Sequence, residues 1–365
     1  MTEKDFMSKA IVKDGMQGKV SFRSPSNIAL VKYWGKKEGQ VPANPSISFT
    51  LDTCATTTGL TYNTLKRPGD DFSFDFFFEG SPKADFRPKI QTFLTRIYPY
   101  MPFLKDFHFI VETSNSFPHS SGIASSASGM SALALCFMEL ERILDPTMDP
   151  NFFKVKASFL ARLGSGSACR SVEGPLVQWG QHKDTKGSSD YYALPYPYRV
   201  HKIFNDYQDT ILLVDKGEKQ VSSSVGHDLM HDHPFAEQRF MQAHKNLSKL
   251  KEVFAQGDLD NFIKIVESEA LALHAMMMTG MPYFILMKPN TLEIINKIWK
   301  FRAATNTPVC FTLDAGANVH VLYPASEKET VLQFIKDELI VYCENRHYIC
   351  DQIGKGAVEL KGDSV

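Results

Sequence analysis

Two stretches of small residues in this chain could bind anions, because small side chains let a phosphate or a carboxylate approach the backbone closely. They are PHSSGIASSA at 118–127 and GSGSACRS at 164–171. Each leads into a stretch with helical character, and the free N–H groups at the start of a helix point toward a bound anion. Two such stretches indicate a pocket for two anionic ligands, as in phosphoryl transfer from a nucleotide to a phosphorylated small molecule.

Three charged residues have side chains suited to phosphoryl transfer, which depends on neutralising charge and on in-line positioning. Lys32 interrupts the apolar run 28–34, where a strand lysine could instead extend to the surface. Arg170 can hold a carboxylate through two parallel hydrogen bonds, although a surface ion pair is the commoner role. Asp314 could accept a hydroxyl proton, but the residues alone favour a turn-forming role before Gly316.

Five segments together resemble the motifs of the diphosphomevalonate decarboxylase family, which belongs to the GHMP kinase superfamily. They are NIALVKYWGK at 27–36, NPSIS at 44–48, the two small-residue stretches, and DAGAN at 314–318. They occur in the family's order, and the segments at 27–36 and 164–171 are much more specific than the phosphate loop of the superfamily. The chain contains neither the GxxxxGK[ST] pattern nor the GxGxxG pattern of other nucleotide-binding proteins.

The resemblance implies an enzyme that uses ATP and Mg2+ to convert mevalonate 5-diphosphate into isopentenyl diphosphate. In this reaction the 3-hydroxyl of the substrate is phosphorylated, and phosphate and CO2 then leave. By the same resemblance, Asp314 accepts or orients the hydroxyl proton, and Lys32 lies near Asp314 and the transferred phosphoryl group. Arg170 holds the substrate carboxylate, and Ser126 faces the ATP phosphates and Mg2+.

The resemblance also implies two sets of binding residues. Further substrate contacts are expected at Tyr33, Trp34, Gly35, Lys36, Ser165, Gly166, Ser167, Ala168, Cys169, Ser223 and Ser224. Further nucleotide contacts are expected at Asn115, Pro118, Gly122, Ala124 and Ser125. No protein residue is assigned as a metal ligand, and His274 is expected to be structural.

The chain departs from the family pattern at several positions. His119, Ser120 and Ser121 make the nucleotide loop more polar than usual, and Ala317 replaces a proline in the turn after Asp314. Asp75 and Ser224 stand where relatives often or sometimes carry arginine. These two changes weaken the preference for a diphosphate, which Lys36 and the stretch 164–170 favour.

Several other functions remain as alternatives. One is a related GHMP kinase or decarboxylase that acts on mevalonate or its monophosphate, and another is a non-catalytic GHMP relative that binds metabolites. His227, His231 and His233 have a spacing that could bind zinc, but no cysteine or firm fourth ligand accompanies them. A serine hydrolase is disfavoured because the chain contains no GxSxG elbow.

The segments that carry the candidate site residues are expected to lie on a scaffold of mixed strands and helices. Strands are expected at 19–23, 46–51, 72–78, 106–113, 209–215, 309–313 and 319–323, and helices at 88–98, 127–144, 151–163, 236–254, 259–278, 291–303 and 327–339. Their order lacks a steady β-α-β rhythm, which favours the α+β class. The resemblance implies the two-lobe GHMP kinase fold, with a ribosomal protein S5 domain 2-like N-terminal lobe at 1–205 and a ferredoxin-like C-terminal lobe at 206–365.

The composition is that of a globular protein with a small-molecule substrate. The chain has 365 residues, of which 43% are hydrophobic and 22% charged, and its net charge of −1 argues against broad binding to nucleic acid or membranes. The longest apolar stretch, 130–138, is too short to span a bilayer, and 1–18 lacks the apolar core of a secretory signal. Six cysteines without CxxC spacing, with Cys136 and Cys310 expected to be buried, suit a reducing cytoplasm. The resemblance implies a homodimer.

Overall fold

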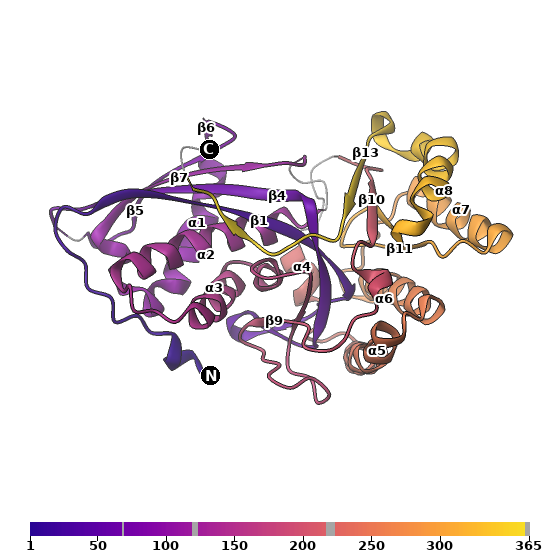
Figure 1. Cartoon of the computed structure of the whole chain (residues 1–365), viewed down its shortest axis with the longest axis horizontal. Helices are drawn as coiled ribbons and strands as arrows, with labels where there is room; N and C mark the ends of the chain where they lie inside the picture. Colours follow the sequence, from indigo (N-terminus) through magenta and orange to yellow (C-terminus); the bar gives the residue numbers. More distant parts are fainter. Residues whose placement is uncertain (68, 119–122, 217–222, 362–365) are drawn as a thin grey trace.

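The computed structural model describes residues 1–67, 69–118, 123–216 and 223–361, which fold around two β-sheets (Figure 1). The larger sheet contains β1 (Gln17–Val31), β4 (Ser46–Thr64), β5 (Ser73–Phe78), β6 (Ser81–Pro82), β7 (Phe107–Asn115), β8 (Leu176–Trp179), β9 (Ala193–Pro195) and β14 (Val358–Glu359). Its order is β14-β1-β4-β7-β5-β6, with β8 paired to β4 and β9 paired to β8. The smaller sheet has the order β11-β12-β10-β13 and contains β10 (Gln208–Leu212), β11 (Cys310–Thr312), β12 (Val319–Tyr323) and β13 (Tyr348–Gln352). A short hairpin pairs β2 (Lys36–Lys37) with β3 (Val41–Pro42).

Three helices pack against the larger sheet (Figure 1). They are α1 (Arg87–Ile97), α2 (Ser125–Leu144) and α3 (Pro150–Gly164). Helix α2 is apolar on most sides and lies in the core, where Leu133 and Phe137 pack with Leu60 of β4 and Phe109 of β7. Burial on both sides is expected of a helix whose apolar residues are not confined to one stripe. This central position fixes the start of α2 relative to the sheet.

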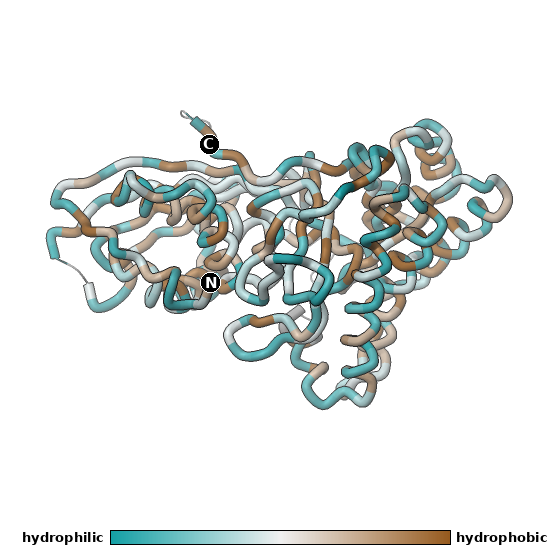
Figure 2. The backbone as a smooth tube through the Cα atoms, turned by 60° about the horizontal axis from the view of Figure 1, so that its bottom comes forward, coloured by the Kyte–Doolittle hydropathy of each residue, from teal (hydrophilic) through white to brown (hydrophobic). Residues whose placement is uncertain are grey.

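The smaller sheet is covered by helices from the C-terminal half of the chain. They are α5 (Ala236–Gln256), α6 (Leu259–Thr279), α7 (Pro289–Thr305) and α8 (Lys328–Phe334), preceded by the short α4 (Ser223–Asp228). Ile294 and Ile298 of α7 pack with Phe311 of β11 and Val321 of β12. Figure 2 shows hydrophobic and hydrophilic segments alternating along these helices, as expected when one helix face is buried and the other is exposed.

A continuous apolar core joins the two halves of the molecule. Ile28 lies near the C-terminal end of β1, and Phe49 lies near the N-terminal end of β4. Both residues pack with Leu247 of α5 and Phe262 of α6. The chain then returns after β13, and β14 pairs with β1 in the larger sheet. The two strands that lead to the candidate site are therefore held by both halves.

The structure differs from the sequence-based expectations mainly in its strands. The strand expected at 46–51 continues to Thr64 because the threonine-rich stretch 53–58 also favours extended backbone. Strands β8, β9, β13 and β14 are short and were not expected, and the last predicted helix is α8 followed by a π-helical turn, Ile335–Leu339. The lobe boundary near residue 205 stays a prediction, although β9 and β10 on either side of it belong to different sheets.

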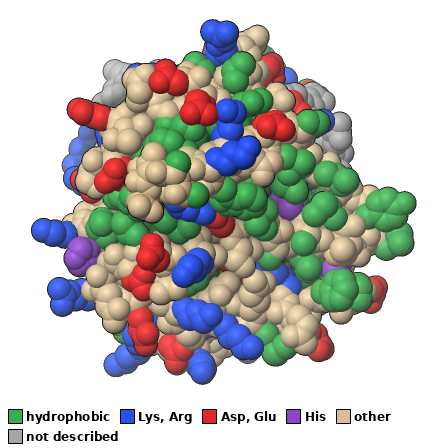
Figure 3. All heavy atoms as spheres, turned by 90° about the vertical axis from the view of Figure 1, so that its right-hand side faces the viewer, with side chains coloured by type: hydrophobic (Ala, Val, Ile, Leu, Met, Phe, Trp, Pro, Cys, Tyr) green, Lys and Arg blue, Asp and Glu red, His purple; other side chains and the backbone are tan. Residues whose placement is uncertain are grey.

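The charge distribution of the surface, the search for membrane-spanning helices and the state of the cysteines can be compared with the expectations from composition. On the face shown in Figure 3, basic and acidic side chains are interspersed. Within the described ranges, no helix has both the length and the apolar character needed to cross a bilayer. All six cysteines are free thiols, and Cys136 and Cys310 are buried as expected.

Candidate active site

A cavity at the junction of the two halves brings together many of the residues singled out from the sequence. The end of β1, the start of α2, the turn after α3 and the loop between β11 and β12 all contribute to it. The predicted site residues that line it are Lys32, Tyr33, Trp34, Lys36, Ala124, Ser126, Ser165, Gly166, Ser167, Arg170 and Asp314. Segments from residues 29 to 315 thus meet at one place.

Lys32 and Asp314 form an ion pair in this cavity. The Nζ atom of Lys32 lies 3.0 Å from Oδ1 of Asp314. The Lys32 side chain is 2% exposed, whereas that of Asp314 is 29% exposed. Burial lowers the pKa of Lys32, and the attraction of Asp314 opposes this shift. The pair therefore presents an accessible carboxylate backed by a buried lysine.

Helix α6 holds the backbone of both residues. The carboxylate of Glu269 accepts a hydrogen bond from the backbone N–H of Lys32 at 2.9 Å, and it also forms a buried ion pair with Arg239 of α5. Further along α6, Nε2 of His274 donates to the backbone oxygen of Asp314 at 3.2 Å. Burial lowers the pKa of His274 to about 4, so the ring is neutral near pH 7. This contact agrees with the structural role expected for His274.

Arg170 is a buried cation whose hydrogen-bond partners are neutral. Its Nε donates to Oγ of Ser48 at 3.0 Å and to Oδ1 of Asn27 at 3.3 Å, and Nη1 donates to Oγ of Ser46. The residue is 3% exposed, and no described carboxylate lies within ion-pair distance of it. Burial lowers the pKa of the guanidinium, but arginine stays charged in proteins. A buried charge without a directly paired carboxylate is costly, so the geometry favours an anionic ligand at this wall of the cavity.

Another part of the cavity combines small residues with aromatic rings and Lys36. The Nζ atom of Lys36 lies 3.3 Å from Oδ1 of Asp228 in α4. The ring of Tyr33 lies against Trp179, with centroids 4.6 Å apart. A Cβ atom at Gly166 would lie 2.8 Å from the Tyr33 hydroxyl, so any larger residue there would have to displace the Tyr33 ring. The backbone after α3 can therefore approach a ligand beside Tyr33.

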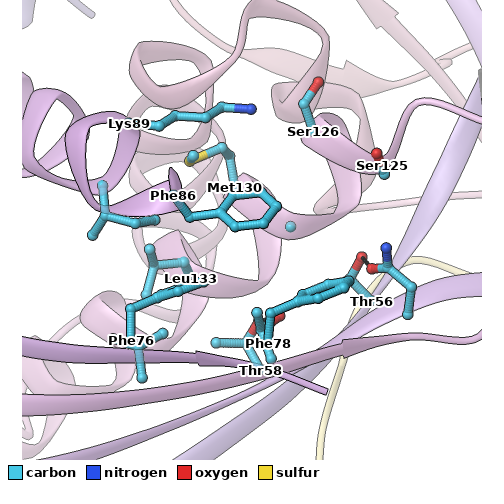
Figure 4. A pocket seen from close by; sticks show the side chains of 15 residues that line it. Thr56, Thr58, Phe76, Phe78, Phe86, Lys89, Ser125, Ser126, Met130 and Leu133 are labelled. Carbon is cyan, nitrogen blue, oxygen red and sulfur yellow. Dashed lines mark hydrogen bonds between the residues drawn. The ribbon is translucent and has the colours of Figure 1, made fainter. Parts of the chain in front are cut away.

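A second cavity adjoins the first at the start of α2 (Figure 4). Its walls are largely aromatic and aliphatic and come from β5, α1 and α2, with a polar side from β4 and β7. The lining includes Phe76, Phe78, Phe86, Ile90, Met130 and Leu133, together with Thr56, Thr58, Thr113 and Asn115. Figure 4 shows Lys89 and Ser126 at one end, and these two residues line both cavities.

Comparison with known proteins places the chain in a family. Residues 24–193 match the model of the diphosphomevalonate decarboxylase-like N-terminal domain, and residues 210–361 match that of the mevalonate 5-diphosphate decarboxylase C-terminal domain. The chain belongs to the diphosphomevalonate decarboxylase family.

Individual relatives of this family align along most of the chain. The diphosphomevalonate decarboxylase of Saccharomyces cerevisiae is 27% identical over 330 residues, which are 86% of this chain and 80% of the yeast protein. The phosphomevalonate decarboxylase of Haloferax volcanii is 26% identical over 314 residues, which are 84% of this chain and 89% of that protein. A solved structure, described as MDDEF in complex with MVAPP, AMPPCP and magnesium, aligns with a TM-score of 0.80 and 28% identity over 95% of this chain and all of its own. The expected α+β class and two-lobe GHMP kinase fold are thus confirmed.

Some predicted contacts of this diphosphomevalonate decarboxylase-family chain lie away from the cavities. Ala168 and Cys169 are buried in the protein, and the Cys169 thiol donates to the backbone oxygen of Gly166. Pro118 is exposed and lines neither cavity, and Gly35 donates its N–H to His227. The roles expected for these four residues stay predictions.

Other predicted positions are described only in part. Gly122 and the polar substitutions at 119–121 lie outside the described residues. Ser223 and Ser224 begin α4, but their side chains are outside the description.

Asn115, by contrast, is fully described: it lines the second cavity, where its Oδ1 accepts a hydrogen bond from Thr56.

The departures from the family pattern have local explanations. Asp75 lines neither cavity, and its carboxylate lies 3.4 Å from Nε2 of His108. Ala317 is buried, and its backbone oxygen accepts a hydrogen bond from Thr291 of α7 at 2.7 Å, which holds the turn after Asp314 without the proline. In this structure, Asp75 and Ala317 thus lie outside the walls of both cavities.

Several residues of the site cannot be recognised from the sequence. Lys89 lines both cavities from α1, and Glu269 fixes Lys32, yet neither belongs to a recognisable motif. The phenylalanine-rich run 72–78 was a possible signal for the aromatic pocket. His227 and His233, considered as zinc ligands, bond instead to Gly35 and to Met276, and no cluster of metal-binding side chains occurs in the described part of the chain.

Proposed function

We propose that this chain catalyses the ATP-dependent decarboxylation of mevalonate 5-diphosphate to isopentenyl diphosphate, releasing ADP, phosphate and CO2, in the mevalonate pathway of isoprenoid biosynthesis. The observation that carries the proposal is the meeting of the Lys32–Asp314 pair and the buried Arg170 in one cavity. A kinase site needs the Lys32–Asp314 pair. The buried guanidinium of Arg170, which has no carboxylate partner, can in addition bind the carboxylate of the substrate.

Phosphoryl transfer begins at Asp314. Its accessible carboxylate orients the 3-hydroxyl of the substrate and accepts the proton as the oxygen attacks the terminal phosphorus of ATP. Lys32, 3.0 Å from Asp314, holds the carboxylate in place and stabilises negative charge on the transferred phosphoryl group. The neutral hydrogen bond from His274 fixes the backbone of Asp314 during this step.

Decarboxylation follows at the carbon chain of the phosphorylated intermediate. The bond between the carboxylate and the substrate breaks, and its electron pair forms the new double bond as the C3–oxygen bond to phosphate breaks. Arg170 orients the carboxylate until CO2 leaves. Because the charge of the carboxylate disappears in this step, the contact helps catalysis only if it does not favour the bound acid over the transition state.

The residues at the start of α2 fit the triphosphate of ATP with its Mg2+. The N-terminus of this 20-residue helix attracts anions, and Ser126 and Lys89 lie where the two cavities meet. Ser126 is the residue that would hold Mg2+, which would supply positive charge to offset that of the phosphates. The aromatic second cavity beside this helix accommodates the base and ribose.

One observation favours a second candidate substrate, mevalonate 5-phosphate. A phosphomevalonate decarboxylase is among the relatives that align with most of this chain. Asp75 and Ser224 also stand where relatives often or sometimes carry arginine, which weakens the preference for a diphosphate. This candidate uses the same Lys32, Asp314 and Arg170.

A comparison of three acids tests the proposal. The purified protein is incubated with ATP, Mg2+ and mevalonate, mevalonate 5-phosphate or mevalonate 5-diphosphate, and ADP release is followed for each acid. We expect the highest kcat/KM with the diphosphate. A higher kcat/KM with the monophosphate would show that mevalonate 5-phosphate is the substrate. No turnover with any of the three acids would indicate that the protein binds metabolites without catalysing the reaction.

The location and assembly form a separate part of the proposal. Six free thiols suit a reducing cytoplasm, where we place this protein. We expect a homodimer, which light scattering on the purified chain can test directly. A mass near that of one chain, 41.1 kDa, at all concentrations would contradict the dimer.

A further inference from the structure

We propose that His227 binds the terminal phosphate of the substrate through its Nε2–H group and thereby favours a diphosphate over a monophosphate. This inference rests on the proposed function. His227 has no role in the resemblance to the family or in the chemistry described above. It belongs to α4, whereas the other residues in this part of the cavity come from the segment after β1 and the turn after α3.

The ring of His227 is held in a fixed position at the cavity wall. It lies against Tyr33, with centroids 4.2 Å apart, and against Trp34, with centroids 4.8 Å apart. The residue is 9% exposed and lines the same cavity as Ser165, Ser167 and Lys36. A side chain packed in this way loses little further freedom when a ligand binds.

A hydrogen bond determines which ring nitrogen carries the proton. The backbone N–H of Gly35 donates to Nδ1 of His227 at 3.0 Å. Because a backbone N–H can only donate, Nδ1 is the acceptor, and the proton of the neutral ring is on Nε2. Within the described residues, the structure gives Nε2 no acceptor. A donor of fixed direction at the wall of an anion-binding cavity fits a phosphate oxygen.

Two positive charges of the cavity act on the ring of His227. Burial is the main cause that lowers the pKa of His227 to about 3, and the positive charges of Lys36 and Arg170 lower it further. The ring is therefore a neutral donor near pH 7 beside two cations. Its neighbours on α4 and β2, Asp228 and Lys36, form an ion pair, so one positive charge is partly compensated before the ligand binds.

Two variants separate the donor from the rest of the side chain. His227→Asn keeps an acceptor at the position of Nδ1 for Gly35 and has no group at the position of Nε2. His227→Gln instead keeps a donor near the position of Nε2. Binding of mevalonate 5-diphosphate and of mevalonate 5-phosphate is measured by calorimetry, and KM for ATP serves as an internal control. The melting temperature of each variant reports whether the fold is retained.

We expect His227→Asn to weaken binding of the diphosphate by roughly 10- to 100-fold, as for a lost hydrogen bond to a charged group. Binding of the monophosphate and KM for ATP should change less than about threefold, and His227→Gln should recover part of the loss. Unchanged diphosphate binding in His227→Asn, equal losses for both acids, or equal losses in both variants would overturn the inference. The wild-type comparison of acids tests the proposed function separately, because it does not involve His227.

Discussion

At the scale of single residues, the site depends on a carboxylate that is accessible and a lysine that is not. Asp314 can reach a ligand, whereas Lys32 is almost fully buried and lies directly behind it. In the proposed mechanism, replacing Asp314 removes the proton acceptor but leaves the proposed nucleotide contacts at the start of α2 in place.

For Asp314→Asn we therefore predict a fall in kcat of about 100- to 10,000-fold, the usual size of a general-base contribution. The dissociation constant for ATP should stay within about twofold of the wild-type value. Steady-state kinetics and nucleotide titration measure the two quantities. Turnover near the wild-type rate would show that Asp314 is not the proton acceptor.

Arg170 allows a test of carboxylate binding that keeps the charge. Arg170→Lys retains a cation but loses the planar pair of donors and the bonds that fix them to Ser46 and Ser48. We predict that kcat/KM for mevalonate 5-diphosphate falls roughly 10- to 100-fold, with little change in KM for ATP. A parallel rise in both KM values would instead indicate a general disturbance of the cavity.

At the scale of elements, helix α6 supports Lys32 and Asp314, the proposed catalytic pair. Glu269 and His274 lie on this helix and bind the backbones of Lys32 and Asp314, which come from opposite halves of the molecule. The helix therefore determines the distance between two residues that are far apart in sequence. A residue that acts in this way positions the catalytic groups without touching the substrate.

Two glutamates on α6 provide a matched comparison. Glu269→Gln leaves Arg239 without its countercharge and weakens the hold on Lys32, so we predict a loss of about 3–5 kcal/mol in stability and a several-fold lower kcat. Glu267 pairs with Arg302 and bonds to Trp299 on α7, away from the cavity. Glu267→Gln should lower stability while kcat is unchanged. If kcat falls equally in both variants, α6 has no specific positioning role.

The sequence predicts those site residues that belong to a local motif. It does not predict residues that reach the site only through contacts between distant segments. The segments 27–36, 164–171 and 314–318 carry their own small residues and charges, and the structure brings them to one cavity. Lys89 and Glu269 are ordinary helix residues in the sequence, and His227 stands out there only through its spacing to His231 and His233. Only the packing of α1, α4 and α6 reveals where these three residues lie. Strand β14 was missed for the same reason, because two residues gain a partner only when the chain returns to β1.

At the scale of the whole molecule, two buried neutral histidines make stability depend on pH. The pKa of His227 is lowered to about 3 and that of His274 to about 4, mainly by burial. In the unfolded chain both rings take up protons below about pH 6.5. The unfolded state therefore binds more protons between about pH 6.5 and pH 4, and stability falls as the pH falls through this window.

We predict that the free energy of unfolding decreases by a few kcal/mol between about pH 6.5 and pH 4.5. The two lowered histidine pKa values set the size of this decrease. Urea unfolding at several pH values measures this slope. His274→Gln removes one of the two groups, so its slope should be shallower even if the variant is less stable throughout. Identical slopes for the variant and the wild-type chain would contradict the assignment.

The central claim is that phosphoryl transfer and decarboxylation take place in a single cavity, where Lys32 and Asp314 act on the hydroxyl and Arg170 on the carboxylate. The most direct test is the ratio of ADP to CO2 released when the wild-type protein turns over mevalonate 5-diphosphate with ATP and Mg2+. We predict one CO2 for each ADP from the first measurable turnovers. Release of ADP without CO2 would contradict it, because the chain would then be a kinase.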